Sequence, residues 1–152
     1  MSTLNILLVD DNRNLVTTLS EGLRKAMGKA ISVAVCFSGS EALSMLARQS
    51  FDVVISEFNL PGESGLELLD KIRQDHPETI LVLVTTYGTD SLEEEVHRLG
   101  IGYIPKPFGI PLLVQIIHDL LRGAETAKKK EETGDESDIL IPDPDKSNAG
   151  MS

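Results

Sequence analysis

Residues Phe51–Gly65 read FDVVISEFNLPGESG, and this stretch decides the fold. Its first part, Phe51–Ile55, is rich in apolar and β-branched residues. Such a run is too short for a helix and is typical of a strand that is buried on both faces of a parallel sheet. The strand leads to Glu57, and a turn rich in Pro and Gly follows. Because ligands of open parallel α/β sheets bind outside the carboxyl ends of the strands, we expect the chemistry of this chain at Glu57.

Short buried runs and segments of helical periodicity alternate about five times along the chain. Gly28 is a natural C-cap, Ser38 and Glu41 fit a capping box, and Pro111 suits a first helical position. The alternation predicts a parallel sheet covered by helices on both faces. Right-handed crossovers allow a flavodoxin-like (βα)5 doubly wound fold with strand order 2-1-3-4-5. We expect strands at Leu4–Val9, Ile31–Phe37, Phe51–Ser56, Thr79–Thr85 and Gly102–Pro105, and a last helix at Pro111–Arg122.

The chain of 152 residues is long enough for one domain with a real core. We expect this domain at residues 1–122 and a disordered, charged C-terminal tail at residues 123–152, because the tail is almost devoid of apolar residues. The exception is Ile139–Ile141, which lies between acids. This run is either a short docking motif or an apolar interruption of a solvated tail.

Composition and charge exclude several classes of function. The formal net charge of −10 argues against nucleic acid as a partner, since phosphate binding needs clustered Lys and Arg. The single cysteine, Cys36, cannot form an internal disulfide and lies in an apolar run, which indicates a buried core residue. We see no signal peptide and no apolar run of the ~20 residues that span a bilayer. The sequence therefore predicts a cytoplasmic protein without a membrane segment.

Polar residues follow four of the five expected strands. Asp10 and Asp11 follow the first, Glu57 ends the third, Thr85 ends the fourth, and Lys106 follows the fifth. Three carboxylates at one edge repel one another unless a cation neutralises them, and a hard divalent ion such as Mg²⁺ prefers oxygen ligands. Lys106 supplies a second positive charge, and the Thr85 hydroxyl can bond an anionic group. Together these residues indicate Mg²⁺-assisted phosphoryl chemistry on a carboxylate.

From Leu4 to about Arg122 the chain resembles the receiver domain of two-component response regulators, of the chemotaxis-protein type. As a set, the motifs that carry the resemblance are highly specific. They are the acid pair Asp10-Asp11, the turn Leu60-Pro61 with Gly65, then Thr85, Tyr103, and Lys106-Pro107-Phe108.

The resemblance implies a role for each matching position. In that family an aspartate four residues before the turn proline accepts a phosphoryl group from a histidine kinase. Mg²⁺ is held by the acid pair, by that aspartate and by the backbone carbonyl two residues later, which here is Asn59. The residue at the Thr85 position then moves toward the phosphoryl group, and the aromatic residue at the Tyr103 position swings inward. Partners dock on the face made by helix four, strand five and helix five.

This sequence departs from the family pattern at the acceptor, because Glu57 stands four residues before Pro61. The extra methylene shifts the carboxylate by about 1.5 Å, and a misplacement near 1 Å can cost ~10²-fold in rate. We therefore expect no efficient phosphotransfer and only weak Mg²⁺ binding. The single charge of Glu57 imitates a phosphoryl group of about −1.5 to −2 only in part. A second departure is Thr86, where the family usually has a small residue.

Three functions fit these observations. The leading one is a stand-alone, phosphorylation-independent receiver of two-component signalling, not an enzyme, that binds a signalling protein such as a histidine kinase or a downstream target. The alternative is a Mg²⁺-dependent switch phosphorylated on Glu57. A Mg²⁺-dependent phosphohydrolase is disfavoured, because the sequence shows no separate general acid. Ile110 and Leu112 either form an exposed patch for a partner or a homodimer, or pack under the last helix.

Overall fold

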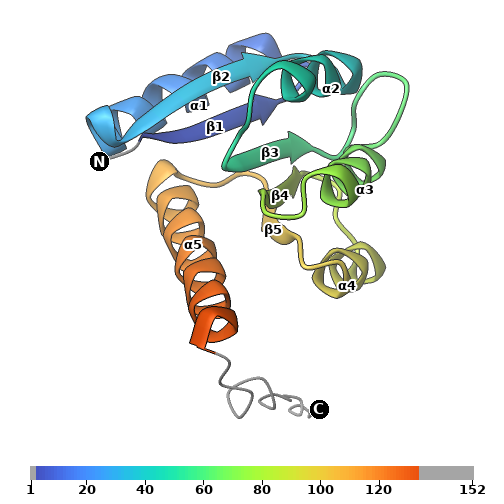
Figure 1. The fold of residues 1–152 in the computed structure, drawn as a ribbon. Coiled ribbons are helices and arrows are strands. Elements are labelled where there is room, and N and C mark those ends of the chain that lie inside the picture. Colours follow the sequence, from blue (N-terminus) through green and yellow to red (C-terminus); the bar gives the residue numbers. More distant parts are fainter. Residues whose placement is uncertain (1–2, 134–152) are drawn as a thin grey trace. The chain divides into compact units, whose positions relative to one another are not determined.

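The structure is a computed structural model that describes residues 3–133 (Figure 1). The chain divides into two units, Met1–Ile117 and His118–Ser152, and the sheet lies in the first. Five parallel strands follow the order β2-β1-β3-β4-β5, which confirms the predicted fold. The elements are β1 (Leu4–Val9), α1 (Arg13–Met27), a 3-10 turn (Gly28–Ala30), β2 (Ile31–Cys36), α2 (Gly39–Arg48), β3 (Val53–Glu57), α3 (Gly65–Asp75), β4 (Ile80–Thr85), α4 (Asp90–Arg98), β5 (Gly102–Pro105) and α5 (Ile110–Thr133).

The apolar side chains of the strands fill two core layers, one on each side of the sheet. Leu7 and Val9 of β1 belong to a cluster with Ala42 of α2, Leu69 of α3 and Val96 of α4. Ile6 and Leu8, which alternate with them in β1, are equally buried but lie outside this cluster, because successive strand side chains point to opposite faces. In Figure 1, α2 and α3 lie in front of the strands, and α1 lies behind them. Buried on both faces, the strands read as the continuous apolar runs seen in the sequence.

The central strand starts later than predicted. We expected it to begin at Phe51, but β3 begins at Val53. Phe51 is buried without pairing, and Asp52 leads into the sheet through backbone hydrogen bonds to Asn5 and Ile80. The apolar pattern therefore predicted the burial of Phe51 correctly, but it predicted a hydrogen-bonded strand that is too long at its start.

Side chains cap the first turns of four helices, and one capping box was predicted in the wrong place. Ser38 does cap α2, but Glu41 accepts from the N–H of Phe37 and not from the N–H of Ser38, so the box is incomplete. The reciprocal box forms instead at the start of α3. There Ser64 accepts from the N–H of Glu67, and the Glu67 carboxylate accepts from the N–H of Ser64. This box fixes the helix that follows the turn after Glu57.

The last helix continues past its predicted end. We expected it to stop at Arg122, and the structure extends α5 as one helix from Ile110 to Thr133. The sequence after Gly123 is made mostly of Ala, Glu and Lys, which have high helix propensity although they bury little. The predicted tail beyond Thr133, with its Ile139–Ile141 motif, lies outside the described residues. Within the described part of the chain, no helix combines the length and apolar character that crossing a membrane requires.

Cys36 is a buried core residue, as predicted, with only 3% of its surface exposed. Burial, together with the nearby Glu41 carboxylate, raises the pKa of the thiol to about 11. We predict that a thiol reagent at pH 8 modifies the folded protein about 10²-fold more slowly than the urea-unfolded chain, because the thiolate is the reactive form. Equal rates before and after unfolding would show that the thiol is accessible in the native state.

Candidate functional site

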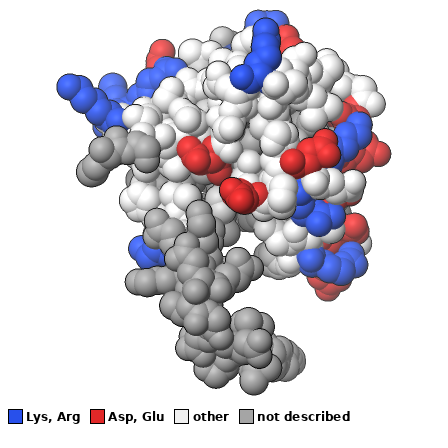
Figure 2. Space-filling view, viewed as in Figure 1, with Lys and Arg blue, Asp and Glu red and all other residues white. Residues whose placement is uncertain are grey.

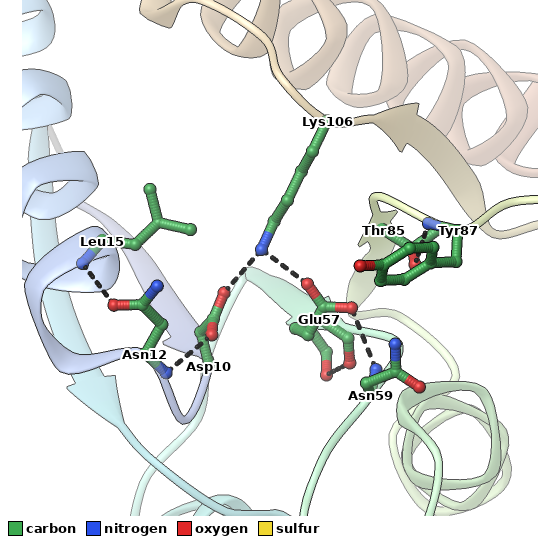
Figure 3. A network of polar contacts seen from close by, with 9 residues as sticks. Asp10, Asn12, Leu15, Glu57, Asn59, Thr85, Tyr87 and Lys106 are labelled. Carbon is green, nitrogen blue, oxygen red and sulfur yellow. Dashed lines mark hydrogen bonds and ion pairs between the residues drawn. The ribbon is translucent and has the colours of Figure 1, made fainter.

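The carboxyl ends of the strands bring Asp10, Glu57 and Lys106 into contact, as the sequence predicted. The Lys106 ammonium lies between the two carboxylates (Figure 3). Its Nζ donates to Oε1 of Glu57 at 2.5 Å and to Oδ2 of Asp10 at 3.0 Å. The sheet order explains this contact, because β1 and β3 are neighbours and the lysine reaches across from the segment after β5.

This ion pair is largely removed from water. The side chains of Lys106, Asp10 and Glu57 are 14%, 6% and 9% exposed. Burial would lower the pKa of Lys106, but the hydrogen bonds to Glu57 and Asp10 outweigh burial and raise its pKa above the ordinary value. The lysine therefore remains an ammonium ion, and it supplies the positive charge that the carboxylates require at this edge.

The second oxygen of each carboxylate is held by the backbone. Oδ1 of Asp10 accepts from the N–H of Asn12 at 2.9 Å, and Oε2 of Glu57 accepts from the N–H of Asn59 at 2.9 Å. Asn59 thus presents its N–H to Glu57 in this arrangement, whereas the resemblance led us to expect its carbonyl as a metal ligand. With two anchors each, both carboxylates have a fixed orientation.

A pocket of about 240 Å³ opens over the ion pair. Asp11 lines it and is exposed, and Thr86 and Tyr87 form another part of its wall. Tyr87 is 75% exposed. The full lining is Asp10, Asp11, Asn12, Glu57, Asn59, Thr86, Tyr87 and Lys106.

Thr85 is fully buried and does not line this pocket. Its hydroxyl accepts from the N–H of Tyr87 at 3.2 Å, and no hydrogen bond joins it to Glu57 among the described residues (Figure 3). Tyr103, the predicted switch residue, is half-buried and packs its hydroxyl against Gly88, where an added Cβ would lie 1.6 Å from it. Burial and the nearby Glu93 raise the pKa of Tyr103. Tyr103 therefore contacts the loop that follows Thr85.

Gly65 is required by the close approach of its backbone to the acceptor strand. An added Cβ would lie 2.0 Å from the carbonyl oxygen of Glu57, and this atom is backbone that cannot move cheaply. We predict that Gly65→Ala lowers the free energy of unfolding by about 1–3 kcal/mol, as overpacking does. Gly123→Ala is the control, since nothing lies near its added Cβ and helix propensity favours Ala. Urea denaturation of both variants checks this, and an unchanged midpoint for Gly65→Ala would contradict it.

The residues present do not form a ready Mg²⁺ site. The donors are of the right type, because Asp10, Asp11 and Glu57 offer carboxylate oxygens. Within residues 3–133, however, no three acidic, histidine or cysteine side chains converge closely enough to hold a metal ion. Two of these carboxylates already bind the Lys106 ammonium. In this arrangement the lysine takes the neutralising role that we had assigned to a divalent ion.

Asn12 and Tyr87 are site residues that sequence reasoning did not single out. The Asn12 side chain accepts from the N–H of Leu15 at 3.1 Å and caps α1, while its own N–H holds Asp10. A polar residue directly before a helix is an N-cap signal, so Asn12 was predictable. Tyr87 carries no such signal, because only the fold places this exposed ring beside the pocket.

Comparison with known proteins identifies the family. The model of the response regulator receiver domain matches residues 6–118. The chain belongs to this family. The response regulator FleR of Pseudomonas aeruginosa is 39% identical over 113 residues, which cover 74% of this chain and 23% of FleR. This chain thus spans about a quarter of the length of that relative.

Solved receiver structures have the same fold. The chemotaxis response regulator CheY4 of Vibrio cholerae has a TM-score of 0.69 at 26% identity, covering 78% of this chain and 99% of its own. The response regulator TrrA of Thermotoga maritima, solved in complex with Mg²⁺ and BeF, has a TM-score of 0.68 at 27% identity and the same coverage of both chains. The receiver is a module of two-component signalling, and its family is predicted correctly from the motifs of the sequence.

Proposed function

We propose that this receiver works without phosphorylation and signals by binding another protein. One observation carries the proposal: the Glu57 carboxylate at the acceptor position is bound to Lys106 at 2.5 Å and to the N–H of Asn59 at 2.9 Å. A nucleophilic carboxylate must be free to approach a phosphorus atom in line. Glu57 is instead longer than aspartate and held at both oxygens, which opposes that approach.

Lys106 and Thr85 are the two residues expected to bind an anionic group at this site, and Glu57 contacts only Lys106. Lys106 is bound to Glu57, whereas the Thr85 hydroxyl bonds the backbone of Tyr87. The glutamate therefore imitates only the lysine contact of an anionic group, in agreement with its single charge. We infer that Glu57 biases the conformation of the domain and does not switch it.

The surface we assign to the partner is built from α4, β5 and the first turn of α5. Leu112 on α5 is 45% exposed, and half-buried Tyr103 lies on β5. Ile110 is half-buried, and its side chain lies against Gly22 of α1, so it contributes less to this surface than Leu112. An exposed leucine and a partly exposed aromatic residue suit a protein partner, either another signalling protein or a second copy.

We predict weak Mg²⁺ binding. A divalent ion would have to displace the Lys106 ammonium from Asp10 and Glu57, or bind mainly through exposed Asp11. Calorimetric titration should therefore give an affinity at least about tenfold lower for the wild type than for Glu57→Asp, whose shorter side chain loosens the ion pair. Equal affinities of the two proteins would contradict the prediction.

The proposal is tested by amide NMR spectra of the wild type with and without acetyl phosphate and Mg²⁺. We expect the signals of Thr85, Tyr103 and α4 to stay in place. The same signals of Glu57→Asp should move, which serves as the positive control. Movement of the wild-type signals would refute the proposal and favour a switch phosphorylated on Glu57.

A further inference from the structure

The outer side of β2 is a sheet edge that no other strand of the sheet covers. β2 stands at the end of the strand order and pairs only with β1. The carbonyl of Cys36 accepts from the N–H of Asp10, so the peptide groups of Cys36 face β1. Because peptide groups of neighbouring strand residues point in opposite directions, those of Val35 face outward. Open edges of this kind are templates for a further strand.

Side chains form hydrogen bonds with the backbone of this edge two residues before and two residues after Val35, but not at Val35 itself. The Arg24 guanidinium donates to the carbonyl of Val33 at 2.8 Å, and the Glu41 carboxylate accepts from the N–H of Phe37 at 2.7 Å. Within the described part of the chain, no hydrogen bond outside the β1–β2 ladder involves the N–H or C=O of Val35. The open stretch is therefore about three residues long.

A groove of about 490 Å³ adjoins this opening, between the end of β2 and α2. Phe37 and Met45 give it apolar surface, and both are half-buried. Arg48 stands on its α2 side. The other lining residues are Val35, Cys36, Ser40, Glu41 and Ser44.

Three arginines lie close to the opening and the groove, whereas the groove lining contains one glutamate. Arg24 binds the carbonyl of Val33 and Arg48 lines the groove, in a chain whose formal net charge is −10. The Arg13 guanidinium stacks 3.9 Å from the ring centroid of Phe37, beside the groove. In Figure 2, further basic side chains gather at the upper left, over the end of α1 and the start of β2, which is the other end of the strand from the groove. The three arginines near the opening favour an acidic ligand.

We propose that the β2 edge binds an acid-flanked apolar strand, and that the occupant is segment 138–141 of a second copy of this chain. This sequence, Asp-Ile-Leu-Ile, lies outside the described residues. Residues 135–145, DESDILIPDPD, contain five acids and no cation. The segment thus has the charge opposite to that of the three arginines near the opening, and it has β-branched residues suited to a strand.

Strand addition at this edge needs only a short apolar segment, because the open stretch around Val35 is about three residues long. Val35 can exchange two backbone hydrogen bonds with an added strand, and alternate side chains of that strand then point to the groove beside Met45. An apolar run of three residues spans the open stretch, and Pro142 ends the pairing because proline lacks an N–H. The flanking acids would lie near Arg24 and Arg48. The site is built from β2, α2 and the residues between them, none of which belongs to the ion pair of Glu57.

The first test adds a synthetic peptide of residues 135–145 to isotope-labelled full-length protein carrying Ile139→Ser and Ile141→Ser, so that its own segment does not compete. We expect the amide signals of Val35 and Phe37 to shift and saturate. Arg48→Glu should lower the affinity for the peptide roughly three- to tenfold. Arg98→Glu is the matched control, an exposed arginine in the last turn of α4, and should change the affinity less than twofold. Absence of shifts at Val35 with millimolar peptide, or equal effects of the two arginine variants, would overturn the proposal.

The second test asks whether a second copy supplies the segment. Light scattering of the full-length wild type should show association that rises with concentration. The association should be lost in the Ile139→Ser/Ile141→Ser variant and kept in the control Met151→Ser. Val35 signals that differ between the wild type and the tail variant equally at all concentrations would show docking within one molecule and overturn the two-copy assignment.

Discussion

Lys106→Met should lower the free energy of unfolding by about 3 kcal/mol, a large effect for a single side chain. Removing one partner of a buried ion pair leaves the other charge buried without compensation, which costs about 3–5 kcal/mol. Here the loss leaves two carboxylates, Asp10 and Glu57, facing each other at 4% and 7% exposure. Urea denaturation gives the change in unfolding free energy from the midpoint and slope.

Two controls isolate the ion pair from other effects of this substitution. Lys71→Met removes a lysine that pairs with Glu63 and whose side chain is more than half exposed. This substitution should lower the free energy of unfolding by less than about 1 kcal/mol. Adding Glu57→Gln to Lys106→Met should restore part of the loss, because it removes one of the two stranded charges. Similar losses for Lys106→Met and Lys71→Met would show that burial adds nothing to this pair.

The contribution of Lys106 has a defined pH dependence. Its pKa in the folded protein is raised above the ordinary 10.5, so the folded state holds this proton more tightly than the unfolded chain. The difference in stability between wild type and Lys106→Met should therefore be constant from about pH 7 to about pH 10 and should shrink as pH rises through the folded-state pKa of Lys106. A difference that grows in alkali would contradict the assignment.

Glu57→Asp should restore phosphotransfer, with a rate at least about 10²-fold above that of the wild type. Shortening the side chain by one methylene withdraws the carboxylate from Lys106 and returns it to the position that the family uses. An oxygen of the aspartate can then attack the phosphorus of acetyl phosphate, which releases acetate as the leaving group. The Lys106 ammonium already lies at this position, whereas the Thr85 hydroxyl has to leave the N–H of Tyr87 before it can bind the phosphoryl group.

The sequence predicted the sheet and the position of Glu57 because both depend on local features. A continuous apolar run indicates a strand buried on both faces, and the residue after that run lies at its carboxyl end. The late start of β3 at Val53 was missed, since burial of Phe51 looks the same in the sequence whether or not the residue pairs. The end of α5 was missed for another reason, because helix propensity without apolar residues resembles the composition of a disordered tail.

The chemistry of the site was only partly predictable. The repulsion expected among the carboxylates correctly predicted a cation at this edge. The sequence did not show that the Lys106 ammonium is a cation that binds both Asp10 and Glu57. Asp10 and Lys106 are 96 positions apart in the sequence. Only the packing of the sheet brings Nζ of Lys106 to 3.0 Å from Oδ2 of Asp10. The role of the Asn59 N–H is likewise a consequence of how the turn after β3 closes.

The most direct test of a phosphorylation-independent receiver is the intact mass of the full-length chain after incubation with acetyl phosphate and Mg²⁺. Wild type and Glu57→Asp are measured side by side, with Glu57→Gln as the negative control. Our account predicts that only the aspartate variant gains the mass of one phosphoryl group. A wild type labelled as fully as the aspartate variant, with no label on Glu57→Gln, would contradict it and show that Glu57 is a working acceptor.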